Sequence, residues 1–126
     1  MKKLIFILFL CSIYGNSISQ EMKVSYTSIN ISNSKLKYSV NANYPQVDFG
    51  PEALMGVRGI ASDINNSLDT TVSGIIKNFE TGVKEMPSEA SHENESTLDI
   101  KGRGWISNGS LFSAELTVFN NVAGMA

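Results

Sequence analysis

Residues 57–79 read VRGIASDINNSLDTTVSGIIKNF, and apolar side chains recur in this stretch at steps of three and four residues. Polar side chains fall between them, so the stretch has the period of an amphipathic α-helix. The pattern predicts one long helix over residues 52–79, with Gly82 as its C-cap. Its apolar face consists of Val57, Ala61, Ile64, Leu68, Val72, Ile75 and Phe79.

The chain before this helix has the two-residue period of β-strands. Residues 35–44 alternate between apolar and polar side chains, which is typical of a strand with one wet face, and Pro45 is expected to end it. Residues 22–31 form another predicted strand, whose apolar positions change parity near Thr27 and Ser28. A β-bulge at that point would reconcile its two halves. The polar residues 32–34 predict a turn between the two strands.

The chain after the helix predicts a second hairpin, with strands at 97–107 and 111–122. Pairing residues whose numbers sum to 218 puts all the apolar side chains on one face and Arg103 opposite Glu115 on the other. A sum of 217 would divide the apolar set between the faces, so we expect the first register, with a three-residue connection over 108–110 or an equivalent bulge. In this register Gly102 and Gly104 face the helix, and the absence of side chains would let it approach closely.

These elements predict the order β-β-α-β-β and the fold class α+β. Two hairpins would form one antiparallel sheet, with one long helix packed on one face. We expect residues 20–126 to form a single domain, because that length suffices for one hydrophobic core.

The first nineteen residues have the layout of a secretory signal peptide. Two lysines precede an apolar run over residues 4–14, which is too short to span a bilayer as a helix. Ser17 and Ser19 then place small residues at positions −3 and −1 of a cleavage site between Ser19 and Gln20. The sequence therefore predicts an exported protein of the periplasm or extracellular space, with a signal peptide at 1–19 and no transmembrane segment in the mature chain.

Cys11 is the single cysteine and lies inside the predicted signal peptide. Lipidation at Cys11 is not expected, because Leu10 stands where a lipoprotein signal has a small residue. The mature chain would contain no disulfide. Loss of Lys2 and Lys3 leaves eight basic residues against twelve acidic ones, which argues against nucleic-acid binding.

Three short motifs, taken in order, resemble a known family. They are Tyr44-Pro45-Gln46, Ile64-Asn65, and Ser113 followed by Gly124-Met125-Ala126. Together they resemble the non-catalytic domain that precedes the catalytic part of PdaC-type peptidoglycan deacetylases, which also forms the outer part of RsiV-like anti-sigma factors. The resemblance covers about residues 22–126.

The resemblance implies a binding or sensing domain of the cell envelope. In the family a histidine follows the Gly-x-Ala end, so we expect the full protein to continue beyond 126. The membrane anchor that an anti-sigma factor requires is not evident in this sequence.

The sequence predicts no catalytic, cofactor or metal site. His92 is the single histidine, whereas a metal-dependent carbohydrate deacetylase needs two histidines and an aspartate. Calcium ligation by the glutamates of residues 85–95 is an alternative, but that segment contains no glycine for a tight turn. Asp63 and Asp69 flank the apolar face of the helix and are expected to face water.

Arg103 and Trp105 are the candidate ligand contacts, because together on an exposed strand face they could stack on a sugar or a peptide. The alternative is an Arg–Glu cross-strand pair beside a partly exposed aromatic ring.

Three functions stay open on the sequence alone. The first is a non-catalytic envelope domain that binds peptidoglycan, another wall glycan or an envelope protein. The second is the accessory N-terminal part of a peptidoglycan deacetylase or other wall hydrolase. The third is a secreted inhibitor. The sequence does not specify an oligomeric state.

Overall fold

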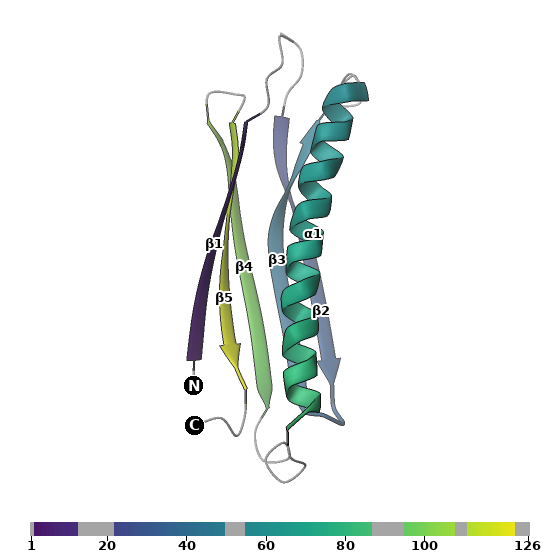
Figure 1. Ribbon diagram of the computed structural model, residues 1–126, viewed down its shortest axis with the longest axis vertical. Coiled ribbons are helices and arrows are strands. Elements are labelled where there is room, and N and C mark those ends of the chain that lie inside the picture. Colours follow the sequence, from purple (N-terminus) through teal and green to yellow (C-terminus); the bar gives the residue numbers. More distant parts are fainter. Residues whose placement is uncertain (1, 13–21, 50–54, 87–94, 108–110, 123–126) are drawn as a thin grey trace.

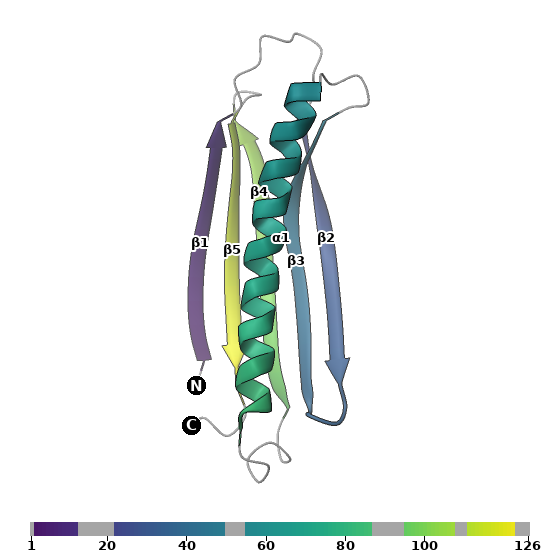
Figure 2. The same ribbon diagram turned by 45° about the vertical axis from the view of Figure 1, so that its right-hand side comes forward.

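The computed structural model describes residues 2–12, 22–49, 55–86, 95–107 and 111–122. One helix lies across one face of a five-stranded sheet, whose strand order is β1-β5-β4-β3-β2 (Figures 1 and 2). The elements are β1 (Lys2–Ser12), β2 (Met22–Asn33), β3 (Tyr38–Phe49), α1 (Met55–Lys84), β4 (Ser96–Ser107) and β5 (Leu111–Asn121).

The predicted α+β class is confirmed, and the order from β2 to β5 is β-β-α-β-β. The prediction of a wholly antiparallel sheet is wrong, because β3 and β4 pair in parallel from Tyr38↔Ser96 to Asn43↔Lys101. The reason is length. A helix of 30 residues rises about 45 Å, and a strand of 12 residues spans about 40 Å. The helix thus returns the chain to the end where β3 began, and β4 starts beside it.

The predicted register of the second hairpin is confirmed. Strands β4 and β5 pair from Thr97↔Asn121 to Ser107↔Leu111, and every pair sums to 218. The closing pair leaves three residues between the strands, although residues 108–110 themselves lie outside the described residues. Most apolar side chains of this hairpin share one face, and Ile100, Phe112 and Leu116 are at most 1% exposed.

Two predictions about the first hairpin are wrong. Strands β2 and β3 pair one to one from Met22↔Phe49 to Asn33↔Tyr38, which leaves no place for a bulge. The turn also starts later than predicted, because Asn33 ends β2 while its Oδ1 accepts a hydrogen bond from the Leu36 N–H at 2.9 Å. The change of parity in β2 is matched by one in β3, whose buried positions pass from even numbers to Pro45 and Val47.

Pro45 does not end its strand, which continues to Phe49. The N–H and the carbonyl of Val47 both bond to Asn65, so the backbone of Val47 points away from β2. Pro45 is two residues earlier and has the same orientation. Its missing N–H therefore removes no bond from the β2–β3 ladder.

The helix extends further than predicted at its C-terminal end, where it continues to Lys84. Gly82 lies inside the helix, so its assignment as a C-cap is wrong. The physical reason is Val83, which is 1% exposed and extends the buried face by one turn beyond Phe79. Residues 52–54 of the predicted helix lie outside the described residues.

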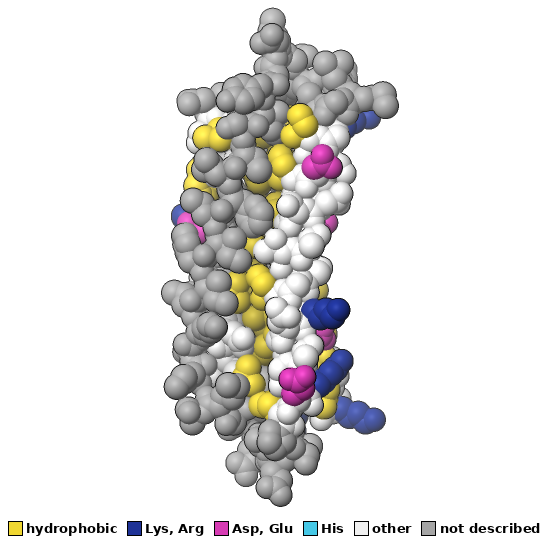
Figure 3. Space-filling view, viewed as in Figure 1, with side chains coloured by type: hydrophobic (Ala, Val, Ile, Leu, Met, Phe, Trp, Pro, Cys, Tyr) yellow, Lys and Arg dark blue, Asp and Glu magenta, His cyan; other side chains and the backbone are white. Residues whose placement is uncertain are grey.

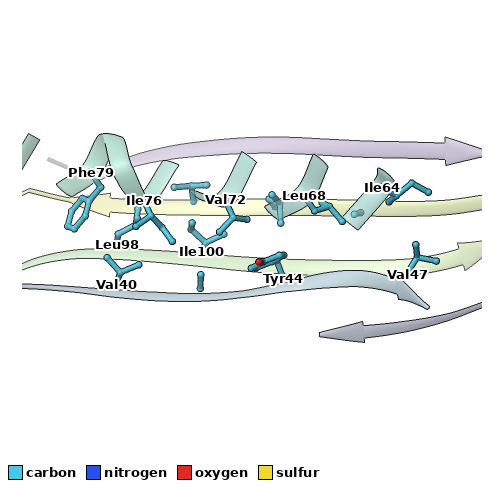
Figure 4. Close-up of a cluster of buried hydrophobic side chains, with 14 of the residues drawn as sticks. Val40, Tyr44, Val47, Ile64, Leu68, Val72, Ile76, Phe79, Leu98 and Ile100 are labelled. Atoms are coloured by element: carbon cyan, nitrogen blue, oxygen red, sulfur yellow. The ribbon is translucent and has the colours of Figure 1, made fainter. Parts of the chain in front are cut away.

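The hydrophobic core lies between α1 and the sheet. Helix residues from Ile64 to Phe79 point toward strand residues such as Val40, Leu98 and Ile100 (Figure 4). Every buried hydrophobic residue of the described core belongs to β3, α1, β4 or β5. On the outside, hydrophobic side chains show as a lengthwise strip beside the polar surface of the helix (Figure 3). One face of the sheet is thus covered by α1.

The sheet divides beyond Asn43↔Lys101, where the pairing of β3 with β4 ends. From there the β2–β3 hairpin lies over the glycines of β4. A Cβ atom on Gly102 would be 2.5 Å from Pro45 Cδ and 2.6 Å from Tyr44 Cα, and one on Gly104 would be 2.7 Å from Pro45 Cβ. The prediction that these glycines make room for the helix is therefore wrong. They make room for β3.

Side chains satisfy the backbone groups that this division leaves without a strand partner. Asn65 Oδ1 accepts from the Val47 N–H at 2.8 Å, and Asn65 Nδ2 donates to the Val47 carbonyl at 2.9 Å. On the facing strand, the Gly104 N–H donates to the Tyr26 hydroxyl at 3.3 Å. Buried backbone groups are costly when unpaired, so these contacts allow the sheet to divide.

Among the described residues, no helix is long and apolar enough to cross a membrane.

Candidate functional site

The outer face of the β4–β5 hairpin, turned away from the helix, carries the predicted contact residues. Lys101, Arg103 and Trp105 alternate along β4 with residues of the opposite face, and all three are exposed. Trp105 is 37% exposed, which is unusual for so large a ring. The structure therefore places both predicted contact residues, Arg103 and Trp105, together on one accessible surface.

Arg103 joins this surface to β5. Its Cζ atom lies 5.4 Å from the centroid of the Trp105 ring, within the range of a cation–π contact. Its Nη2 atom donates to Glu115 Oε2 at 3.3 Å, in the predicted cross-strand pair. The pair contributes little to stability because the Arg103 side chain is 70% exposed, but it holds the guanidinium beside the ring.

Phe119 is a second exposed aromatic residue of this face, and it was not among the contact residues predicted from the sequence. It is 43% exposed and pairs with Asp99, and it lines a depression of about 320 Å³. The register could have revealed it, because a sum of 218 puts Phe119 opposite Asp99 on the wet face. The depression is lined by Thr97, Asp99, Lys101, Phe119, Asn120 and Asn121.

The two aromatic rings mark the ends of an elongated surface. Phe119 lies beside Asp99, and Trp105 is six residues further along β4, which corresponds to about 20 Å. Between them lie Lys101 and Arg103 on β4 and Glu115 on β5. We call this surface, from Phe119 to Trp105, the aromatic face. Its charges have mixed sign, and its shape suits an extended ligand without strong net charge.

A second polar cluster joins β3 to the helix. Asp69 Oδ1 accepts hydrogen bonds from the Tyr44 hydroxyl and from Gln46 Nε2, both at 2.7 Å. The prediction that Asp69 faces water is wrong, because its carboxylate turns toward these two donors; Asp63 is exposed, as predicted. The motif Tyr44-Pro45-Gln46 thus meets the helix close to Asn65, and its polar groups serve to join the two layers.

Alkaline pH should weaken the protein through Tyr44. Burial raises the pKa of Tyr44 from 10.0 to about 12, and its hydrogen bond to Asp69 acts in the same direction. A pKa raised by folding means that the stabilisation is complete below pH 10 and is lost as the pH rises toward 12. Urea melts across this interval should show the loss, and Tyr44→Phe should make the dependence shallower. An unchanged slope in Tyr44→Phe would contradict the assignment.

The groove at the end of β3 is a weaker candidate. It has a volume of about 370 Å³ and lies between the end of β3 and the first turns of α1. Asn65, which lines it, already bonds to the backbone of Val47. Phe49 is the single aromatic residue among those that line it, and it is only partly exposed. This groove therefore offers a ligand fewer exposed aromatic rings than the aromatic face does.

Most of the remaining sequence candidates lie outside the part of the chain that the structure describes. His92 and two of the glutamates considered for calcium, Glu89 and Glu93, lie outside the described residues. Glu85 and Glu95 are exposed. Within the described ranges, no three His, Cys, Asp or Glu side chains are close enough together to hold a metal ion.

Comparison with protein-family models, with curated proteins and with solved structures found no match to this chain.

Proposed function

We propose that the chain is an exported, non-catalytic domain of the cell envelope that binds an extended wall glycan across the aromatic face. The observation that carries the proposal is the exposure of Trp105 and Phe119 on one sheet face. Large aromatic rings left in water at a surface are typical of binding sites, and their flat faces stack on the apolar faces of sugar rings.

The polar side chains around Phe119 favour a glycan. Beside Phe119, Asp99, Lys101 and the amide of Asn121 line the same depression and offer donors and acceptors for hydroxyl groups. Because the aromatic face carries both acidic and basic side chains, it has no field of one sign that would select a polyanion. The resemblance to the PdaC-type domain supports the same class of ligand, since that domain accompanies peptidoglycan-modifying enzymes.

Co-sedimentation with insoluble peptidoglycan tests the proposal. Trp105→Ala and Phe119→Ala should each weaken binding by up to about tenfold, because an aromatic contact contributes about 0.5–1.5 kcal/mol. Ile60→Ala is the matched control, since Ile60 is an apolar residue 41% exposed on the helix. Sedimentation of both aromatic variants to the same extent as the parent would refute the proposal.

If the protein is exported as proposed, the first residue of the mature chain can be predicted. The mature protein should begin at Gln20, because Ser17 and Ser19 occupy the positions that signal peptidase reads. N-terminal sequencing of the exported protein measures this directly. A chain that still carries Met1, or one that begins at a lipid-modified Cys11, would contradict it.

A further inference from the structure

The outer edge of β5 is covered by the same residues that the proposed export would remove. Strand β1 pairs antiparallel with β5 from Lys2↔Asn121 to Ser12↔Leu111, along the full length of both strands. Residues 2–12 are also the charged start and the apolar run of the predicted signal peptide. Cleavage before Gln20 would therefore leave β5 as the edge of the sheet.

We propose that, in the processed chain, the edge of β5 accepts an extended apolar segment of another polypeptide as an additional antiparallel strand. The proposal rests on the export part of the proposed function and is independent of glycan binding. An added strand would bond to the row of N–H and C=O groups that removal of β1 exposes. Strand addition of this kind is an established mode of peptide recognition.

The composition of β5 favours such a partner. Its sequence, LFSAELTVFNN, contains no proline and no lysine, and its one charged residue, Glu115, is paired with Arg103. It also pairs one to one with β4, so no bulge turns its edge away. Proline, lysine and bulges are the features by which proteins keep an exposed edge strand from pairing, and β5 has none of them. At the opposite edge, β2 carries Lys23 and is rich in Ser, Thr and Asn.

The burial of β5 is typical of an interior strand. Its residues on the helix side, from Phe112 to Val118, are at most 1% exposed. An apolar strand is also what the full chain provides at this position, because residues 4–11 read LIFILFLC. The occupant we infer therefore has the chemistry of that segment: about eleven residues, extended and predominantly apolar.

Peptide binding to the exported, processed protein tests the inference. The probe is a fluorescent synthetic peptide of residues 2–12 carrying Cys11→Ser, followed by fluorescence anisotropy. We expect saturable binding with one peptide per chain. The uncleaved chain, whose β5 edge is occupied by β1, should bind at least about tenfold more weakly. Equal binding by the two forms would overturn the proposal.

Backbone methylation separates strand pairing from simple hydrophobic adsorption. In an antiparallel ladder only alternate residues direct their N–H groups toward a given neighbour. Of two peptides N-methylated at alternate positions, one on the odd and one on the even residues, one should lose binding and the other should retain it. Equal loss or equal retention would overturn the proposal.

The folded state and the oligomeric state of the processed chain also test the proposal. The described core residues lie between Tyr38 and Val118, all of which the processed chain keeps, so we expect it to be folded by circular dichroism. If it is unfolded alone, folding on addition of the peptide supports the inference and its absence refutes it. A dimer that the peptide does not bind would make a second copy the occupant and refute it. Trp105→Ala should bind the peptide normally, which separates this result from any failure of glycan binding.

Discussion

Gly102→Ala is expected to destabilise the protein by about 3 kcal/mol, the upper end of the usual cost of overpacking. The new Cβ atom would lie 2.5 Å from Pro45 Cδ and 2.6 Å from Tyr44 Cα. One of these neighbours is a backbone atom and the other belongs to a proline ring, so neither can move aside as a flexible side chain would. Gly102→Val should destabilise the protein more than Gly102→Ala does, although valine favours strands.

Two substitutions serve as controls for this result. Gly74 lies in the helix, and apart from its chain neighbours and the adjacent helix backbone no atom lies within 4 Å of an added Cβ, so Gly74→Ala should stabilise the protein by up to about 1 kcal/mol. Lys101→Val, on the exposed face of the same strand, should melt close to the parent. If urea melts instead show Gly102→Ala as stable as the parent, the hairpin β2–β3 does not lie over β4 as described.

Asn65→Ala is expected to cost about 2 kcal/mol, because it removes the partner of two backbone groups at once. The N–H and the carbonyl of Val47 would both lose their bonds, and each buried unpaired group costs about 1–3 kcal/mol. Water from the adjoining groove can replace part of this loss, so the lower end of the summed range applies.

Hydrogen exchange gives a residue-level measurement of the same effect. The amide of Val47 should be protected in the parent and should exchange faster in Asn65→Ala. Asn66→Ala is the matched control, because Asn66 is an exposed amide that lines the same groove. Unchanged protection of the Val47 amide in Asn65→Ala would contradict the role given to Asn65.

Local periodicity was sufficient to predict α1, the strands β2 to β5 and one register. The 3.6-residue period located the helix, and the position of Ile100, Leu116 and their neighbours on one face fixed the pairing of β4 with β5. The candidate pair Arg103 and Trp105 followed from that register. The same register places Phe119 opposite Asp99 on the exposed face, but an apolar residue among the apolar residues of β5 is expected in the core.

The features that the sequence did not predict depend on contacts between distant residues. Tyr44 and Asp69 are separated by 25 positions, and Gly104 and Tyr26 by 78. The prediction that Asp69 faces water was wrong because its hydrogen-bond partners, Tyr44 and Gln46, come from β3. The parallel pairing of β3 with β4 likewise depends on the matched lengths of α1 and β3, and the local hydrophobic patterns of the two elements do not encode that match.

The central claim is that the aromatic face binds a wall glycan, and Trp105 offers the most direct measurement because it is the only tryptophan in the chain. A titration of the ¹⁵N-labelled protein with soluble peptidoglycan fragments should shift the single indole Nε1–H resonance. The backbone amides of Asp99, Lys101 and Phe119 should shift with it, whereas those of the exposed helix surface around Ile60 should not. Saturation of the titration with the indole and these amides unmoved would contradict the claim.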